Sequence, residues 1–329
     1  MSSSVGSEII SSVWKGTIKL KIALDRELTE VANGEGGDGV TIQDPRLSEE
    51  IDIPIFYTTS NRNTYFHFLL PQILFFFSDH IKDKESLSRN DWWVEFENVP
   101  LKWNWPLGLL HDIYRSYNPS NKNANAEPWD LVLKFNKNKY PISDIIPIAE
   151  EPNNNEHFSL IPLVEDPSSI KFLETYWVNQ MKESCFVLNG SSKSIMNLSK
   201  ESSSNLWRSV AFKNADTFEG IFRSILPKHV GLINHVPVRF YLPISNLVLQ
   251  PVIAPINPET KSKTTLGEVL QKNTEDLFPA SLMYTVALPV CHGVLVPMNT
   301  PIIDLFFLMK YMDGFLHINI IMAEKMVMT

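Results

Sequence analysis

The sequence is poor in cysteine and has no long apolar segment. Its 329 residues include only two cysteines, Cys185 and Cys291, far apart in the chain. Secreted domains that depend on disulfides are rich in cysteine, so we expect a protein of a reducing compartment, the cytoplasm. The longest apolar run, residues 66–77, is interrupted by Pro71 and is too short to cross a bilayer. We also expect no signal peptide, because no apolar core follows Met1.

Motifs of common catalytic and metal sites are missing as well. The chain has no H-E-x-x-H motif, no C-x-x-C pair, no Walker loop and no G-x-S-x-G turn. The glycines of residues 34–39 are followed by Asp44-Pro45 and not by a helix, which excludes a dinucleotide-binding turn and indicates a hairpin insertion over residues 30–50. We therefore expect no cofactor, no metal site and no catalytic residue.

One pair of residues leaves an enzymatic alternative open. Cys291 and His292 are adjacent, and a thiol beside an imidazole is the basis of cysteine-dependent catalysis. Neighbours in a strand point to opposite faces, however, so the two side chains would not share a proton there. The pattern favours a buried structural cysteine over a catalytic one.

The charge distribution argues against nucleic acid as a partner. The net charge is −8, whereas binding to phosphates needs clustered lysine and arginine. Residues 167–235 are an exception, because eight basic against five acidic residues leave a charge of +3. Such a region has the surface of an ordinary solvated helical module, or it contacts an acidic partner or an anionic membrane. A membrane-binding module is therefore an alternative function.

The hydrophobic fraction of 44% is typical of a globular protein, and its pattern predicts three structural units. Alternation of apolar and polar residues predicts strands at 14–24, 53–59, 92–97, 101–103 and 128–135, with helices over 65–81, begun at Pro71, and over 108–117. From Ser168 the apolar residues follow a helical period, and Asp216 with Glu219 predicts a helix cap. Beyond residue 237 we predict strands at 238–242, 247–253, 284–290 and 315–321, with a helix after the Thr265–Glu268 capping box and another over 302–312 that ends at Gly314.

This order of elements predicts an α+β fold with two ubiquitin-like β-grasp domains that flank a helix-rich domain. We expect an N-terminal segment with a short helix at residues 1–12 and a first ubiquitin-like domain at 13–138. A linker at 139–167, rich in proline, asparagine and glutamate, precedes the helix-rich domain at 168–235. The second ubiquitin-like domain is expected at 236–325.

Clustered tryptophans suggest a protein that works through contacts. Trp92 and Trp93 are neighbours on a predicted strand, so both cannot face the same core. At least one of them must lie in a second interface, either within the molecule or with a partner.

Residues 100–112 have the sequence PLKWNWPLGLLHD, which resembles the segment P-L-K-W-H-Y-P-I/V-G-L-L-F-D of the autophagy-related protein 5 family. Asn104 and Trp105 depart from that pattern. Other similar segments occur in the same order along nearly the whole chain: Val13–Gly16, Trp92-Trp93, Pro128-Trp129, Leu206-Trp207 and Phe315–Ile320. The resemblance implies the same three-part fold that the pattern of elements predicts.

The resemblance also implies a function. Members of that family accept the ubiquitin-like modifier autophagy-related protein 12 through an isopeptide bond, delivered by the conjugating enzyme autophagy-related protein 10. They bind autophagy-related protein 16, and the assembly acts like an E3 ligase in attaching autophagy-related protein 8 to phosphatidylethanolamine during autophagosome formation. We expect a non-catalytic scaffold that lies peripherally on the membrane of the phagophore assembly site.

The position that matches the family's acceptor is Lys182. It lies in the predicted first helix of the helical domain, about 120° from the apolar stripe that includes Met181, and therefore towards solvent. Sequence alone favours it only slightly over Lys193 and Lys200. Glu183 and Ser184 are candidates for assisting the amine, although the main activating groups are expected from the conjugating enzyme.

Two further positions match family residues close to the protein 16 interface. Gly108 lacks a Cβ atom and so permits close approach of a partner helix, or it is needed for the turn after Pro106. Arg62 is the second candidate for partner binding.

Overall fold

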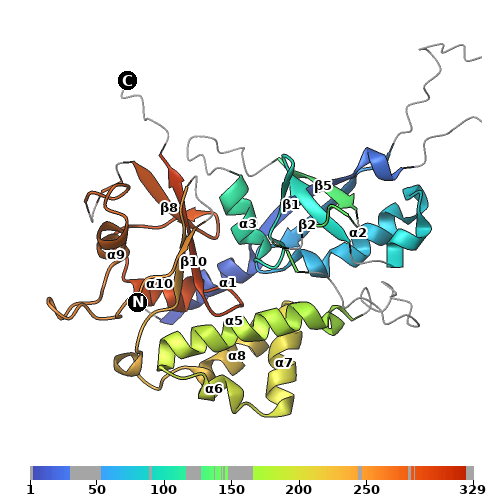
Figure 1. Ribbon diagram of the computed structural model, residues 1–329. Coiled ribbons are helices and arrows are strands. Elements are labelled where there is room, and N and C mark those ends of the chain that lie inside the picture. Colours follow the sequence, from blue (N-terminus) through green and yellow to red (C-terminus); the bar gives the residue numbers. More distant parts are fainter. Residues whose placement is uncertain are drawn as a thin grey trace, which may run out of the picture.

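The architecture is that of a computed structural model, which describes residues 3–29, 53–88, 91–115, 127–136, 138–141, 143, 145–146, 166–243, 247–280, 283–284 and 286–323. The predicted hairpin insertion at 30–50 and most of the predicted linker lie outside these residues. The described chain forms two lobes, each with a sheet, and a helical module (Figure 1).

The first lobe is built around strand β1 (Thr17–Leu24), whose alternating pattern buries Leu20 and Ile22 completely. It forms a five-stranded sheet in the order β2-β1-β5-β3-β4, in which β1 pairs with β5 in parallel and the other pairs are antiparallel. The remaining elements are β2 (Phe56–Asn61), α2 (Leu70–Phe77), β3 (Trp92–Phe96), β4 (Val99–Pro100), α3 (Leu107–Tyr114) and β5 (Trp129–Phe135). Pro71, predicted as the first residue of this helix, is its second, and it is tolerated there because the first turn needs no backbone donor.

The helical module consists of α5 (Lys171–Asn189), α6 (Lys193–Met196), α7 (Lys200–Ala211) and α8 (Ala215–Ile225). Helix α5 ends at Gly190, which adopts φ +68°. The cap of α8 is Asn214, whose side chain accepts from the Thr217 amide at 3.0 Å. The predicted cap at Asp216 is therefore wrong by two positions, because that carboxylate already lies inside the first helical turn.

The second lobe repeats the plan of the first, with a sheet in the order β7-β6-β10-β8-β9 and a central parallel pair, β6 with β10. Its elements are β6 (Val238–Tyr241), β7 (Val248–Leu249), α9 (Leu266–Asn273), β8 (Ala287–Cys291), β9 (Val294–Leu295), α10 (Ile302–Met309) and β10 (Leu316–Met322). The predicted capping box is present, since Thr265 and Glu268 bond to each other's backbone amides. Short 3-10 turns occur at Arg26–Leu28, Phe66–Phe68, Ser78–His80, Lys84–Ser88, Pro167–Ser169 and Val230–Leu232. The prediction of an α+β fold with two such lobes and a helical module is confirmed.

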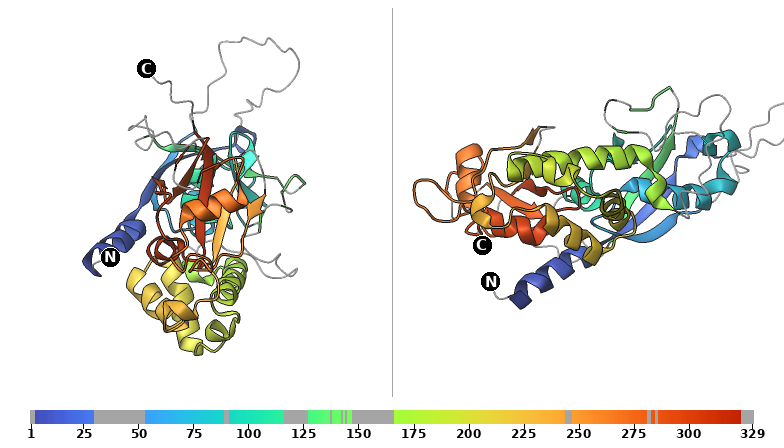
Figure 2. Two further views of the ribbon diagram at one scale, coloured as in Figure 1. Left: turned by 90° about the vertical axis from the view of Figure 1, so that its left-hand side faces the viewer. Right: turned by 90° about the horizontal axis from the view of Figure 1, so that it is seen from below.

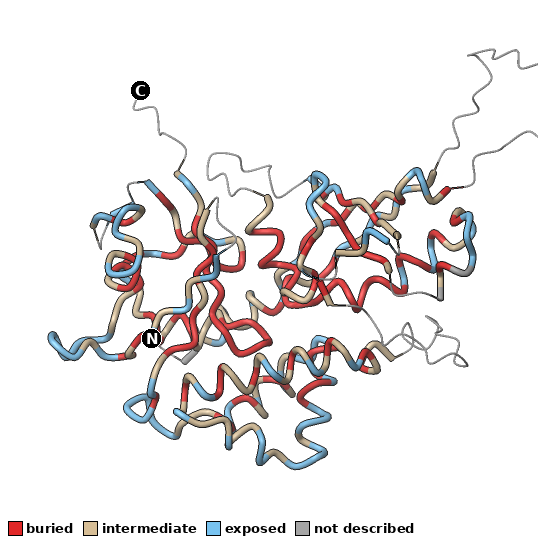
Figure 3. Tube along the Cα trace, in the orientation of Figure 1, coloured by how far each residue is buried: buried red, intermediate tan, exposed pale blue. Residues whose placement is uncertain are grey.

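Helix α5 is the part of the helical module that runs beneath both lobes (Figure 1). The N-terminal helix α1 (Ser3–Lys15) extends from the first lobe and packs against α10 of the second, which two further views make visible (Figure 2). Buried residues follow the sheets and the inner side of α5 (Figure 3), and they form one continuous cluster through all three parts. The lobes and the helices therefore share a core.

Several tryptophans lie elsewhere than the pattern predicted. Trp14, predicted in a strand, is in α1 and packs on Phe218 of α8 at a ring distance of 5.4 Å. Trp92 and Trp93 are both buried, because Tyr140, from the predicted linker, covers the second face of β3 against Trp93. The predicted second interface of this pair is thus internal. The strand predicted at 101–103 lies earlier in the chain, as β4 at Val99–Pro100.

Candidate functional site

Lys182 lies on α5, on the side away from the core. Leu173, Trp177 and Met181 on the same helix are at most 1% exposed, whereas Lys182 is half-buried. Its amine forms no hydrogen bond or ion pair with any residue that the structure describes. The side chain is therefore partly open to solvent and uncommitted, which is the placement that the helical period predicted.

The same side chain lines a groove between α5, α6 and α7. The groove has a volume of 300 Å³, and its remaining walls are Trp177, Val178, Ile195, Met196, Leu198, Ser203 and Leu206. Lys182 is the only charged residue among the eight that line it. The acceptor candidate thus lies at the edge of an apolar depression.

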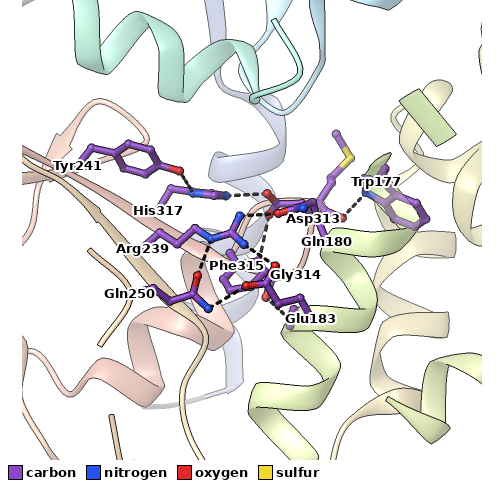
Figure 4. A network of polar contacts seen from close by, with 12 residues as sticks. Trp177, Gln180, Glu183, Arg239, Tyr241, Gln250, Asp313, Gly314, Phe315 and His317 are labelled. Atoms are coloured by element: carbon purple, nitrogen blue, oxygen red, sulfur yellow. Dashed lines mark hydrogen bonds and ion pairs between the residues drawn. The ribbon is translucent and has the colours of Figure 1, made fainter. Parts of the chain in front are cut away.

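On the opposite flank, α5 is anchored to the second lobe by Arg239 of β6 (Figure 4). The guanidinium donates to Glu183 Oε2 at 2.9 Å and to Gln180 Oε1 at 2.5 Å, and it lies 3.7 Å from the centre of the Phe315 ring. Gln250 donates to the second oxygen of Glu183 at 3.0 Å. Such a forked, charge-assisted contact fixes both the position and the rotation of the helix.

Two further bonds tie α5 to the turn before β10. Trp177 Nε1 donates to the Met312 carbonyl at 2.9 Å, and Ser184 Oγ donates to the Gly314 carbonyl at 2.5 Å. Gly314 adopts φ +83°, and a Cβ atom there would lie 2.6 Å from Ser184 Oγ. Glu183 and Ser184, which the sequence offered as helpers of Lys182, are therefore occupied in anchoring the helix.

A buried chain of polar groups supports this turn. His317 contacts Asp313 Oδ2 through Nε2 at 2.7 Å and the Tyr241 hydroxyl through Nδ1 at 2.8 Å (Figure 4). Burial alone would raise the pKa of Asp313, but the charge and hydrogen bond of His317 hold that pKa below its ordinary value. The turn against which α5 packs is thus held by buried hydrogen bonds inside the second lobe.

The structure brings Arg62 and Gly108 together, far from the surface. The Gly108 amide donates to the Arg62 carbonyl at 2.7 Å, and the Arg62 guanidinium donates to the Gly108 carbonyl at 3.0 Å. Arg62 is only 8% exposed and forms an ion pair with Asp112. Lys182 takes part in none of these contacts.

Asp112 connects this pair to the second lobe. Its carboxylate accepts from the Gly293 amide at 2.8 Å, and its carbonyl accepts from the Asn319 side chain. Burial would raise the pKa of Asp112, but Arg62 first, together with hydrogen bonds, keeps that pKa below its ordinary value. We call the contact formed by Arg62, Gly108, Asp112, Gly293 and Asn319 the interlobe seam.

Cys291 and His292 lie next to this seam and do not form a catalytic pair. Cys291 is fully buried, and burial raises the pKa of its thiol well above the ordinary value. Burial, and after it the charge of Arg62, lowers the pKa of His292 to about 3. Cysteine catalysis needs a thiolate beside a protonated imidazole, and this environment favours the opposite state of both groups.

Other kinds of site are not evident in the described part of the chain. No group of three or more His, Cys, Asp or Glu side chains is arranged there to hold a metal ion. Among the helices of the described residues, none combines the length and apolarity that a bilayer span requires.

Sequence models of a known protein family match most of the chain. The model described as the UblA domain of autophagy protein ATG5 matches residues 13–135, the one for its alpha-helical bundle region matches 170–228, and the one for its UblB domain matches 235–320. The chain belongs to the autophagy protein 5 family. Its two lobes are the UblA and UblB domains of that family, and its helical module is the family's helical bundle region.

Individual members of the autophagy protein 5 family are similar over almost their full length. Autophagy protein 5 of Pichia angusta is 40% identical over 319 residues, covering 97% of this chain and 98% of its own. The protein of Candida albicans is 32% identical over 318 residues, with 96% and 97% covered. The crystal structure of Kluyveromyces marxianus Atg5 has the same fold, with a TM-score of 0.68, 23% identity and coverage of 95% and 99%.

Reasoning from the sequence missed several residues that position the candidate site. Arg239 was overlooked, although a charged residue between Val238 and Phe240 in a buried strand was a usable signal. Asn319 was also overlooked, although it is the one side-chain amide in the apolar sequence of β10. The groove residues Ile195 and Met196 gave no signal, because only the folded bundle brings them beside Lys182.

Proposed function

We propose that this protein is the scaffold that receives the ubiquitin-like modifier autophagy-related protein 12 on Lys182 through an isopeptide bond. It also binds autophagy-related protein 16 without a covalent bond. The assembly then acts as an E3-like factor that promotes transfer of autophagy-related protein 8 to phosphatidylethanolamine during autophagosome formation. In this proposal the scaffold has no catalytic site of its own and works in the cytoplasm, peripherally at the phagophore assembly site membrane.

The observation that carries the proposal is the placement of Lys182 on a helix of a family member. An acceptor amine must be reachable, must lack a competing ion pair and must lose its proton as it attacks. Lys182 meets the first two conditions among the described residues. Lys171, also on α5, is paired with Glu174 at 2.7 Å.

The chemistry requires little from the scaffold. The Lys182 nitrogen forms the new amide bond with the thioester carbonyl of the modifier, the thiolate of the conjugating enzyme leaves, and the amine proton passes to a base. Because Glu183 is held by Arg239 and Gln250, that base must come from the conjugating enzyme, autophagy-related protein 10. The contribution of the scaffold is to hold the amine on a rigid element.

Replacement of Lys182 by arginine tests the proposal. Lys182→Arg keeps the charge and most of the length, so we expect a normal fold and an intact protein 16 complex but no covalent adduct on a denaturing gel. Lys193→Arg is the control, because Lys193 is an exposed lysine of the same helical module and its replacement should leave the adduct at its normal level. An undiminished shifted band from the Lys182→Arg protein would refute the assignment.

For autophagy-related protein 16, the proposal keeps Arg62 and Gly108 as residues that matter to binding. Their burial supports an indirect effect: they hold the interlobe seam, and the seam sets the relation between the two lobes to which a partner helix would bind. A substitution that weakens the seam should then weaken protein 16 binding together with stability.

A further inference from the structure

Three consecutive serines, Ser202, Ser203 and Ser204, lie in the first turns of α7, and of these only Ser203 lines the groove beside Lys182. Ser203 is exposed, and its hydroxyl forms no hydrogen bond within the part of the chain that the structure describes. Ser202 differs, because its hydroxyl is bonded to that of the Ser199 cap at 2.9 Å. Ser204 is exposed but is not a wall of the groove. Ser203 therefore combines an uncommitted hydroxyl with a place next to the acceptor candidate.

The surroundings of Ser203 favour a negative charge. Lys182 faces the same groove from α5 and is the only charged residue among those that line it. Lys200 lies three residues before Ser203 on one face of α7, and in the described ranges of the chain neither lysine forms an ion pair. The first turn of α7 adds the positive end of its helix dipole. Two lysines and a helix N-terminus thus adjoin a side chain that carries no charge of its own.

We propose that Ser203 is a phosphorylation site, and that its phosphate pairs with the Lys182 ammonium and prevents this amine from accepting the modifier. The inference rests on the proposed isopeptide bond at Lys182 and adds a means of regulating it. In the modification, Ser203 Oγ forms a bond to the terminal phosphorus of a nucleoside triphosphate. The bond from that phosphorus to the leaving nucleoside diphosphate breaks, and the hydroxyl proton passes to a base of the protein kinase.

A phosphate at Ser203 would control Lys182 through its charge. It carries a charge of about −1.5 to −2 at neutral pH and three acceptor oxygens. Ser203 and Lys182 are walls of one groove of 300 Å³, so the long, flexible lysine side chain reaches the phosphate. The ion pair keeps the amine protonated, and an ammonium has no lone pair with which to attack a thioester carbonyl. The phosphorylated chain should therefore remain unconjugated until a phosphatase removes the group.

The preceding residues also distinguish Ser203 from its neighbour. Lys200 stands three positions before Ser203, whereas Glu201 stands three positions before Ser204. A kinase selects its substrates partly by the charge pattern around the hydroxyl, so an enzyme that favours a basic residue at this distance would choose Ser203. Because helix ends open more readily than helix centres, the first turn of α7 is also accessible to such an enzyme.

A chain synthesised with phosphoserine in place of Ser203 tests the contact without any conjugating enzyme. Acylation by acetic anhydride, followed by peptide mass spectrometry, measures the reactivity of each lysine. We expect Lys182 to react about fivefold more slowly than in the unmodified chain. Lys171 is the internal reference, because it lies in the first turn of α5, is paired with Glu174 at 2.7 Å and should not change. The slowing should shrink in about 0.5 M salt, which screens an exposed pair.

Two matched variants separate charge from position and size. Phosphoserine in place of Ser204 puts the same charge one residue further along α7, outside the groove. Ser203→Gln adds bulk to the groove without a charge. Both should leave Lys182 within about twofold of its normal rate of acylation. Equal slowing by either variant would overturn the proposal, since it would show a non-specific charge effect or simple obstruction.

Phosphate mapping of the protein from its own cells tests whether the modification occurs. We expect phosphate on Ser203 in the unconjugated pool and none in the conjugated pool, because the phosphorylated chain cannot accept the modifier. Ser203→Ala, which cannot be phosphorylated, should raise the conjugated fraction. Absence of phosphate on Ser203 from both pools, or equal amounts in both, would overturn the proposal.

A single-turnover conjugation assay distinguishes failure of this inference from failure of the proposed function. The chain with phosphoserine in place of Ser203 should form the adduct about fivefold more slowly, in parallel with acylation. A branched peptide at Lys182 that forms on this chain at the normal rate would leave the proposed function intact and refute the inference. A branched peptide at another lysine would refute the acceptor assignment itself, and the regulation with it.

Discussion

Gly108 lies where a side chain has no room. A Cβ atom added to it would be 2.7 Å from the Arg62 Cβ and 2.9 Å from the Arg62 carbonyl oxygen. Because one of these atoms belongs to the backbone, relief would require movement of the chain that carries the Asp112 ion pair. At this residue the requirement for glycine is internal to the protein, whatever its effect on a partner.

We predict that Gly108→Ala lowers the free energy of unfolding by about 1–3 kcal/mol, the cost of overpacking a buried site. Gly220→Ala is the control, since Gly220 is an exposed position within α8 with nothing within 4 Å of an added Cβ. It should raise stability by roughly 0.5–1 kcal/mol, because alanine favours the helix. Urea denaturation of both variants measures this, and a Gly108→Ala protein as stable as wild type would contradict it.

Among the helices and strands, α5 is held in position by contacts with several other parts of the protein. One flank meets the helical bundle, the other flank meets Arg239 and the turn at Gly314, and Lys182 occupies the side between them. The helix ends in a left-handed Gly190, but its rotation about its own axis is set by these neighbours. The direction in which the Lys182 amine points thus depends on how α5 packs against its neighbours.

We predict that Arg239→Gln lowers the free energy of unfolding by about 1–3 kcal/mol and slows conjugation at Lys182. Arg239 is 12% exposed in its side chain and bonds to two residues of α5. Arg208→Gln is the control, because Arg208 is 50% exposed and pairs with the similarly exposed Asp166, which should cost about 0–1 kcal/mol. Denaturation and single-turnover conjugation assays compare the two, and equal effects would argue against the anchor.

At the scale of the whole molecule, the two lobes meet at the buried ion pair of Arg62 with Asp112. The interlobe seam joins Asp112 of the first lobe to Gly293 and Asn319 of the second. His292, beside the seam, stacks on Tyr311 with ring centroids 3.8 Å apart, and its Nε2 donates to the Met309 carbonyl at 3.0 Å. Protonation of this histidine must therefore oppose the packing of the lobes.

The sign of the resulting pH dependence follows from the lowered pKa. The unfolded chain takes up a proton on His292 near its ordinary pKa of 6.5, whereas the folded chain does so only at about 3. Between these values the unfolded state binds more protons, so stability falls as the pH falls through this window. We predict a loss of about 2 kcal/mol from this residue between pH 7 and pH 5.

His292→Asn tests this prediction, since asparagine tolerates the φ of +51° at this position and does not titrate. The variant should lose about 2 kcal/mol less than wild type between pH 7 and pH 5 in chemical denaturation. The remaining dependence is expected from His111, whose pKa burial also lowers. An unchanged difference between the two pH values would show that His292 is not the responsible group.

Much of the fold was accessible to prediction because its elements carry strong local patterns. The alternation in β1, the proline at the start of α2 and the capping box of α9 are each determined within a few residues. One wrong prediction depended on a distant part of the chain, because Trp14 belongs to a helix that packs on α8. Another was a local error of two positions, since the cap of α8 is Asn214 and not Asp216.

The amino-acid pattern by itself determined the order of strands and helices, the apolar stripe of α5 and the outward direction of Lys182, because each depends on the period of one element. The tertiary structure alone decided what surrounds that lysine and how the lobes meet. Arg239 and Glu183 are 56 residues apart in the chain, and Asp112 and Gly293 are 181 apart. Contacts over such separations depend on how whole elements pack, and no local period encodes them.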